Sequence, residues 1–193
     1  YASLGYWEDE NNIWYGGSNY NLGWAQILRL DTKNSEWEVD LNLGLNFLRP
    51  EILKEVVFTK DFLGNQLENP DTILIAGAYS ANYFSGSAKA NIFLRNDVIG
   101  EWNQLLVFEG DLSDGESYSM RDIEIYTDQI TGVEHLMVSV GTKGIFSGKY
   151  NPNSEGRIEM NSNPEIGPLG VRSLGITVAN NNLYFSSGNK LFK

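Results

Sequence analysis

Short runs of hydrophobic and β-branched residues, separated by turns rich in glycine and asparagine, follow one another along the whole chain. Runs such as residues 56–60, 72–77 and 136–141 are too short for helices, and no stretch has sustained helical periodicity. Asparagine tolerates positive φ at low cost, so the asparagine-rich turns suit tight connections between strands. The pattern therefore predicts an all-β protein.

The runs recur as four copies of one unit. Residues 3–15 align without a gap with residues 173–185, at an offset of 170, and two further copies lie between them. We expect one domain with repeats over residues 1–48, 49–112, 113–166 and 167–193. The second strands of the copies begin near four residues that we expect to be buried at equivalent positions: Ile13, Ile73, Leu136 and Leu183.

Each copy continues with a third strand, and three copies continue with a fourth. Ile27 and Ile92 open the third strand of the first two copies, and a tryptophan follows each of them ten residues later, as Trp37 and Trp102. We predict that both indoles are buried between adjacent sheets. Truncating such a side chain to alanine costs about 3 to 5 kcal/mol.

Repeated four-stranded sheets are stable when they are stacked radially, because this buries both faces of each sheet and leaves only short edges. The predicted fold is therefore a β-propeller segment of four-stranded antiparallel blades, with about three and a half blades visible. A β-sandwich or an open repeat array is the alternative. Three full blades and three further strands do not close a ring. We therefore expect that the missing strand comes from elsewhere or, as we favour, that the chain is part of a longer protein.

Glycines end the second strand of three copies, as Gly16-Gly17, Gly77 and Gly141, and a tryptophan follows later in the first two. This arrangement resembles the Kelch repeat. Residues 121–150 and 174–192 are similar to uncharacterised bacterial and algal propeller proteins. The resemblance implies a β-propeller repeat protein and no particular activity.

Charge and composition exclude several classes of function. The formal net charge is −11, which repels the phosphates of nucleic acids and of anionic membranes. No apolar run reaches the ~18 residues of a membrane helix. Cysteine is absent, so disulfides, thiolate nucleophiles and cysteine metal sites are excluded. The localisation stays open, with a secreted protein favoured.

Few residues are candidates for catalysis or metal binding. His135 is the only histidine, and we assign it to a surface turn because no nucleophile motif accompanies it. Glu36, Glu38 and Asp40 are expected to point to one side of a strand, toward solvent. The best local candidate for calcium is the loop with Asp111, Asp114 and Glu116, although an ordinary solvated turn is the favoured interpretation of this loop, and we expect no other cofactor.

Two loops between second and third strands combine aromatic and small polar residues, a composition typical of surfaces that bind by stacking and adaptable hydrogen bonds. We expect a non-catalytic binding or scaffold module, with a carbohydrate or a protein as partner. A hydrolase with acidic residues in the propeller channel and a structural subunit of an assembly are the alternatives. The candidate ligand-binding residues in these loops are Asn19, Tyr20, Trp24, Tyr79, Asn82 and Tyr83.

Overall fold

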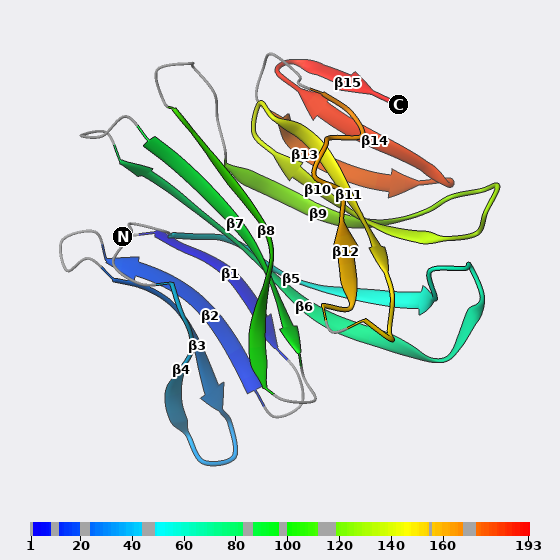
Figure 1. The fold of residues 1–193 in the computed structure, drawn as a ribbon. Coiled ribbons are helices and arrows are strands. Elements are labelled where there is room, and N and C mark those ends of the chain that lie inside the picture. The colour runs from blue at the N-terminus through cyan, green and yellow to red at the C-terminus, as the bar shows by residue number, and fades with distance from the viewer. Residues whose placement is uncertain are drawn as a thin grey trace. The chain divides into compact units, whose positions relative to one another are not determined.

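The computed structural model describes residues 2–8, 12–19, 24–43, 49–82, 87–96, 100–111, 119–154, 156–167 and 173–193. All regular elements in these ranges are strands, so the protein is all-β, as predicted. The strands form four antiparallel sheets, and in each sheet the strands lie side by side in chain order (Figure 1). This up-and-down order is compatible with a propeller-like fold.

Sheets 1 and 2 have four strands each. Sheet 1 contains β1 (Ala2–Glu8), β2 (Asn12–Asn19), β3 (Trp24–Asp31) and β4 (Glu36–Asn42). Sheet 2 contains β5 (Arg49–Lys60), β6 (Gln66–Asn82), β7 (Ser87–Asn96) and β8 (Glu101–Asp111).

Sheet 3 also has four strands, whereas sheet 4 has three in the described part of the chain. Sheet 3 contains β9 (Met120–Thr127), β10 (Glu134–Val140), β11 (Gly144–Tyr150) and β12 (Ile158–Met160). Sheet 4 contains β13 (Ser173–Ala179), β14 (Asn182–Ser187) and β15 (Lys190–Phe192).

The chain folds as two compact units. The first unit comprises Tyr1–Glu55 and Leu74–Gly115, and the second comprises Val56–Ile73 and Glu116–Lys193. The long strands β5 and β6 are shared by the two units. The first part of β5 and the last part of β6 belong to the first unit, whereas the hairpin that joins the two strands belongs to the second. Sheet 1 packs on sheet 2 in the first unit, and sheet 3 packs on sheet 4 in the second.

The repeat alignment of the first and last copies is confirmed by the strand registers. Tyr6 pairs with Tyr15 in sheet 1, and Ile176 pairs with Phe185 in sheet 4. In both sheets the pairing between the first and second strands shifts by one residue near the start of the first strand. Sheet 3 has the same irregularity, between Ser139 and Val140 of its second strand. The turn of sheet 4 uses Asn180 and Asn181 at positive φ, as the asparagine-rich turns predicted.

Sheets 1 and 2 share a second irregularity, between their third and fourth strands. The ladder shifts between Ile27 and Leu28 in sheet 1 and between Ile92 and Phe93 in sheet 2. Asp40 is therefore the extra residue of a β-bulge in β4. Below we call two residues equivalent when they hold the same place in the ladders of their sheets.

The hydrophobic clusters of the two units are built from equivalent residues. Each cluster lies where one sheet packs on the next, and its members come from the facing sides of the two sheets. The equivalent members in the first and second units are Trp14 and Met137, Ile27 and Ile145, Leu41 and Ile166, Leu74 and Leu183, and Ala76 and Phe185.

The hairpin of β5 and β6 packs on sheet 3 within the second unit. The ring of Phe58 stacks on that of Tyr150, with centroids 4.5 Å apart. Buried Glu134, at the start of β10, accepts hydrogen bonds from the backbone N–H groups of Thr59, at 2.7 Å, and Lys60, at 3.0 Å. The Thr59 hydroxyl also donates to Glu134, at 2.7 Å.

The predicted set of buried second-strand residues is only partly right. All four residues lie in the second strands of their sheets, but Ile13 and Leu183 are half-buried, whereas Ile73 and Leu136 are buried. The register of β6 with β7 makes Leu74, rather than Ile73, equivalent to Ile13. A shift of one residue points the side chain to the other face of the sheet.

The prediction for Trp37 is wrong, and the reason is its neighbourhood. Trp37 pairs with Leu30 and Trp102 pairs with Arg95, so the two tryptophans are equivalent. Trp102 is half-buried because its face of sheet 2 packs on sheet 1. Trp37 is 55% exposed, and it is absent from the described residues that pack against the cluster between sheets 1 and 2.

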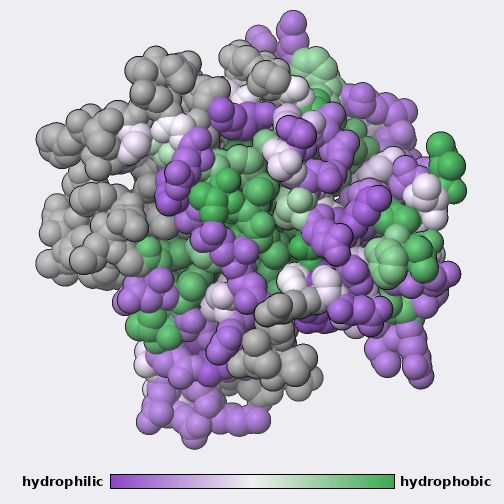
Figure 2. All heavy atoms as spheres, in the orientation of Figure 1, coloured by the Kyte–Doolittle hydropathy of each residue, from purple (hydrophilic) through white to green (hydrophobic). Residues whose placement is uncertain are grey.

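Hydrophilic side chains are spread over the face of the molecule in Figure 2, with hydrophobic side chains visible between them. Such mixing is usual, because apolar atoms contribute about half of most protein surfaces. Within the described ranges, no helix has the length and apolarity that crossing a membrane requires.

Candidate functional site

A cleft of about 710 Å³ lies between sheets 1 and 2 in the first unit. Its floor consists of Leu43, Asn91 and Phe93, which are all buried. The remaining lining residues are more exposed, and most are polar: Asn42, Lys89, Gln104, Val107 and Glu109. A volume of this size is typical of sites for small ligands.

Asn91 is the most unusual residue of the cleft. It is 3% exposed, and no donor in the described part of the chain bonds to its side-chain oxygen. A buried acceptor without a partner costs about 1–3 kcal/mol, so native proteins rarely keep one. Asn91 is therefore an acceptor that a ligand in the cleft can satisfy.

The charges at the rim of the cleft neutralise each other. Lys89 and Glu109 face each other across β7 and β8, and the Lys89 Nζ lies 2.5 Å from a carboxylate oxygen of Glu109. The other polar groups are the amides of Asn42, Asn91 and Gln104. An amide offers both donors and an acceptor, so the site matches neutral polar groups such as hydroxyls.

The cleft lies at the end of the sheets from which the predicted aromatic loops leave. The last residue pair before one loop is Asn19 with Trp24, and the last pair before the other is Asn82 with Ser87. Lys89 lies two residues from Ser87 on β7. The loops themselves, residues 20–23 and 83–86, lie outside the described residues.

The predicted ligand-binding residues are therefore located only in part. Asn19, Trp24 and Asn82 lie at strand ends, and their side chains are outside the described set, as are Tyr20 and Tyr83. Tyr79 is a half-buried residue of β6 rather than of a loop. Ala76 and Ala78 face sheet 1. Because side chains alternate between the two faces along a strand, Tyr79 points to the opposite face of sheet 2. The assignment of these six residues to ligand binding stays a prediction.

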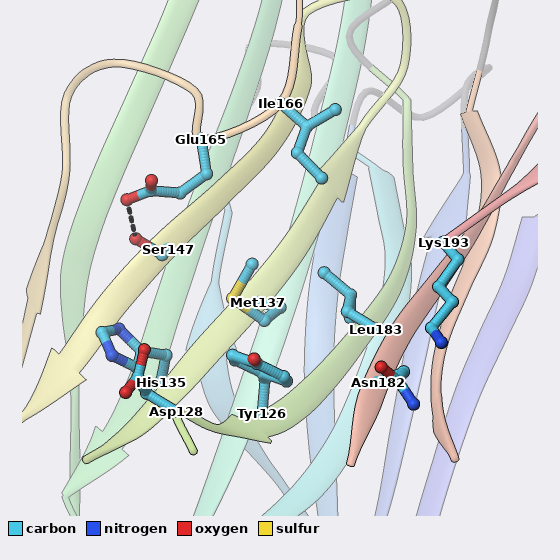
Figure 3. A pocket seen from close by; sticks show the side chains of 10 residues that line it. All are labelled: Tyr126, Asp128, His135, Met137, Ser147, Glu165, Ile166, Asn182, Leu183 and Lys193. Carbon is cyan, nitrogen blue, oxygen red and sulfur yellow. Dashed lines mark hydrogen bonds between the residues drawn. The ribbon is translucent and has the colours of Figure 1, made fainter. Parts of the chain in front are cut away.

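A second pocket, of about 400 Å³, lies in the second unit between sheets 3 and 4. Figure 3 shows Tyr126, Met137 and Leu183 gathered at its centre and Ile166 above them. The polar side chains lie around this apolar centre: Asp128, His135, Ser147, Glu165, Asn182 and Lys193.

Glu165 and Ser147 are joined by a hydrogen bond (Figure 3). The Ser147 hydroxyl donates to Glu165 Oε1 at 2.6 Å, and the Asn161 side chain donates to both groups at 2.8 Å. Ser147 is buried, whereas Glu165 is exposed. The serine is thus bonded to a carboxylate and not to His135, which is not the arrangement of a nucleophilic triad.

His135 is half-buried in β10, so its assignment to a surface turn is wrong. Successive side chains of a strand point to opposite faces of the sheet, so the His135 side chain points away from the face of Leu136 and lies on the pocket face beside Met137. Burial lowers the pKa of His135, and the charge of Lys149 lowers it further. The carboxylates of Asp128 and Glu165 act in the opposite direction but do not outweigh these effects.

The carboxylates singled out in the sequence have different positions. Glu36 and Glu38 are exposed as predicted, but the side chain of Asp40 is only 5% exposed, so its assignment to solvent is wrong. The bulge and the packing of sheet 2 enclose it. Asp111 is the last residue of β8, and Asp114 and Glu116 lie outside the described residues. Within the described ranges, no three acidic or histidine side chains cluster as metal ligands would.

Sequence patterns gave little sign of these two sites, because both lie between sheets. Asn91 occurs in a hydrophobic strand, and an asparagine at an inward-facing position is the one signal that the sequence offers. Comparisons of the chain with models of protein families and with curated protein sequences find no match.

Proposed function

We propose that the chain is a non-catalytic binding module that takes a neutral, hydroxyl-rich ligand, a carbohydrate, in the cleft between sheets 1 and 2. The observation that carries this proposal is the buried side-chain oxygen of Asn91 on the floor of the cleft, to which no donor among the described residues bonds. The three lining amides supply complementary donors and acceptors for hydroxyls, and Phe93 offers an apolar surface for a sugar ring.

The architecture that we propose for this module is a β-propeller, loosely Kelch-like, whose blades are the four sheets. Its support is the equivalence of the residues by which sheet 2 packs on sheet 1 and sheet 4 packs on sheet 3. Ligands of such repeat folds commonly bind where loops of adjacent sheets meet. The cleft is at such an end, next to the strand ends at Trp24 and Asn82.

The alternative of a hydrolase gains no support from the described residues. A glycosidase requires a carboxylic acid whose pKa is raised, so that it holds a proton at neutral pH. The carboxyl groups with clearly shifted pKa values in the described ranges are all shifted downward, chiefly by hydrogen bonds that outweigh any effect of burial: Asp31, Asp40, Asp61 and Asp128.

A glycan array probed with four forms of the protein tests the binding proposal. The wild type and a matched control, Gln66→Leu, should bind the same glycans, because Gln66 is an exposed amide outside the cleft. Asn91→Leu should lose at least about tenfold in affinity without loss of stability, since the variant removes an unsatisfied buried acceptor. Gln104→Leu should weaken binding less.

Two results contradict the proposal. One is an array on which the folded wild type binds no glycan. The other is a glycan profile that Asn91→Leu and Gln104→Leu leave as unchanged as Gln66→Leu does, which would assign Asn91 to the packing of the sheets.

A further inference from the structure

One wall of the cleft between sheets 1 and 2 is formed by β7 and β8, which lie side by side in sheet 2 (Figure 1). The lining residues of these strands face each other in three pairs, which are, from the rim inward, Lys89 with Glu109, Asn91 with Val107, and Phe93 with Gln104. Alternate residues of a strand point to one face, so the three side chains from β7 line the cleft together. The wall therefore carries charges at the rim and amides beside apolar side chains further in.

The neighbours of Asn91 in its sheet are apolar. Asn91 faces Val107 on β8 and Ala78 on β6, and Phe93 follows two residues later on the same face. Leu43 completes the floor of the cleft from the side of sheet 1. A polar group among such side chains costs free energy unless it is hydrogen-bonded, yet no donor among the described residues bonds to the Asn91 oxygen. The terminal torsion of an asparagine is soft, so this amide can turn toward a donor that enters the cleft.

The hydrogen bonds that this floor can offer decide which ligand group fits it. A hydroxyl has one donor and two acceptor lone pairs, so a hydroxyl bound to Asn91 would leave its own acceptors against apolar side chains. An ammonium has three donors and a charge, which makes its burial more costly still. The nitrogen of a secondary amide has a single donor, so the single oxygen of Asn91 satisfies it completely.

The remaining parts of an acetamido group also match residues of the cleft. Its methyl group is apolar, and Phe93, Val107 and Leu43 offer apolar contacts. Its carbonyl oxygen requires a donor, which the exposed side-chain amide of Gln104, directly opposite Phe93, can supply. The group as a whole is uncharged, which suits a rim where Lys89 and Glu109 neutralise each other.

We propose that the floor of the cleft is an acetamido subsite, so that the ligand is a glycan with an N-acetylated amino sugar. The N–H of its acetamido group donates to the side-chain oxygen of Asn91, the methyl group contacts Phe93 and Val107, and the carbonyl accepts from Gln104. This inference rests on the carbohydrate-binding function proposed above and adds the substituent that the site selects. A hydroxyl in the same place binds more weakly, because its lone pairs stay unpaired.

Matched pairs of immobilised glycans test this subsite. The two members of a pair differ only in an acetamido group or a hydroxyl at one carbon of the terminal sugar, and the pairs cover the gluco, galacto and manno configurations. Titration of the intact protein over these glycans gives an affinity for each member. In the pairs that the protein binds, the acetamido member should bind at least about tenfold more tightly than the hydroxyl member.

Variants of two facing residues identify the origin of this preference. Asn91→Leu removes the acceptor and should reduce the ratio of the two affinities to about one, whereas loss of a residue that only packs the sheets would change both affinities alike. Val107→Asn, at a half-buried position, should lower the ratio by strengthening the hydroxyl member, since a second amide supplies the partners that a hydroxyl lacks. This variant also tests the subsite should Asn91→Leu fail to fold. The control Gln66→Leu should keep the ratio of the wild type.

The outcomes separate this inference from the proposed function. Binding of no glycan by the folded protein contradicts carbohydrate binding altogether, and the acetamido subsite with it. Binding in which the hydroxyl members match or exceed their acetamido partners leaves carbohydrate binding intact and overturns the subsite. An acetamido preference that Asn91→Leu and Val107→Asn both leave unchanged also overturns it, because the preference would then arise elsewhere in the protein.

Discussion

Replacement of Asp40 by alanine is the sharpest perturbation of the first unit. The variant leaves the Arg95 guanidinium, with a side chain 6% exposed, and the indole N–H groups of Trp14 and Trp102 without their shared acceptor. Removing one partner of a buried ion pair costs about 3–5 kcal/mol, because the remaining charge stays buried without that carboxylate. That is a large fraction of the about 5–15 kcal/mol that stabilises most proteins.

Urea unfolding, followed by tryptophan fluorescence and circular dichroism, measures this loss. Glu38→Ala is the matched control, since Glu38 lies on the same strand and pairs with Arg29 while remaining largely exposed. An exposed pair of this kind contributes about 0–1 kcal/mol. If Asp40→Ala and Glu38→Ala destabilise the protein equally, the reasoning about the buried carboxylate is refuted.

The same carboxylate makes stability depend on pH. Burial alone would raise the pKa of Asp40, but hydrogen bonds from Arg95, Trp102 and Trp14 and the charge of Arg95 lower it overall. A carboxyl whose pKa is lowered on folding contributes stability above its unfolded pKa of about 3.9, and this stability is lost as the pH falls through the folded pKa. The stability difference between wild type and Asp40→Asn should thus be constant from pH 5 to 7 and shrink below about pH 4. A difference that does not change with acidification contradicts this assignment.

Two further predictions concern the second unit, and both are measured by thermal or urea unfolding. Glu134→Ala should cost about 1–3 kcal/mol for each backbone donor of the β5–β6 hairpin that it leaves unpaired, whereas Glu134→Gln, which keeps an acceptor, should cost less; equal losses would contradict the role of the carboxylate. Gly144→Ala should destabilise by more than about 1 kcal/mol, because Gly144 has φ of +119° and an added Cβ would lie 2.1 Å from the Ile166 carbonyl oxygen. Gly156→Ala, whose Cβ would meet no atom closer than 3.8 Å, is its control, and a similar loss in both variants would argue against steric strain.

The sequence was sufficient to predict the architecture of the individual sheets. Ungapped similarity between residues 3–15 and 173–185 reflects an identical strand register, and the spacing from Ile27 to Trp37 reflects a shared bulge. Local patterns of this kind depend on the alternation of side chains and on turn residues, which are encoded in short segments. The class of the fold follows from the same patterns.

The sites were not predictable in the same way, because they depend on how one sheet packs on the next. Asp40 and Trp37 both lie in β4, whose polar sequence predicts exposure to solvent. Asp40 is enclosed because its side chain faces sheet 2, whereas Trp37 points to the other face of sheet 1 and is exposed. Glu165 directly precedes Ile166 in sheet 3 as Asp40 directly precedes Leu41 in sheet 1, but two additional residues between Met160 and Ile166 hide this correspondence in the sequence. An alignment that continued past this insertion to Ile166 would have revealed it.

The central claim is that sheet 2 packs on sheet 1, and sheet 4 on sheet 3, through equivalent faces, and that the packing of sheet 2 on sheet 1 encloses Trp102 while the equivalent Trp37 is exposed. Hydrogen exchange of the indole N–H groups, measured by NMR on the wild type, tests this most directly. The signals of Trp14 and Trp102, which donate to Asp40, should exchange much more slowly than that of Trp37, which is 55% exposed. Exchange of the Trp102 indole as fast as that of Trp37 would contradict the account.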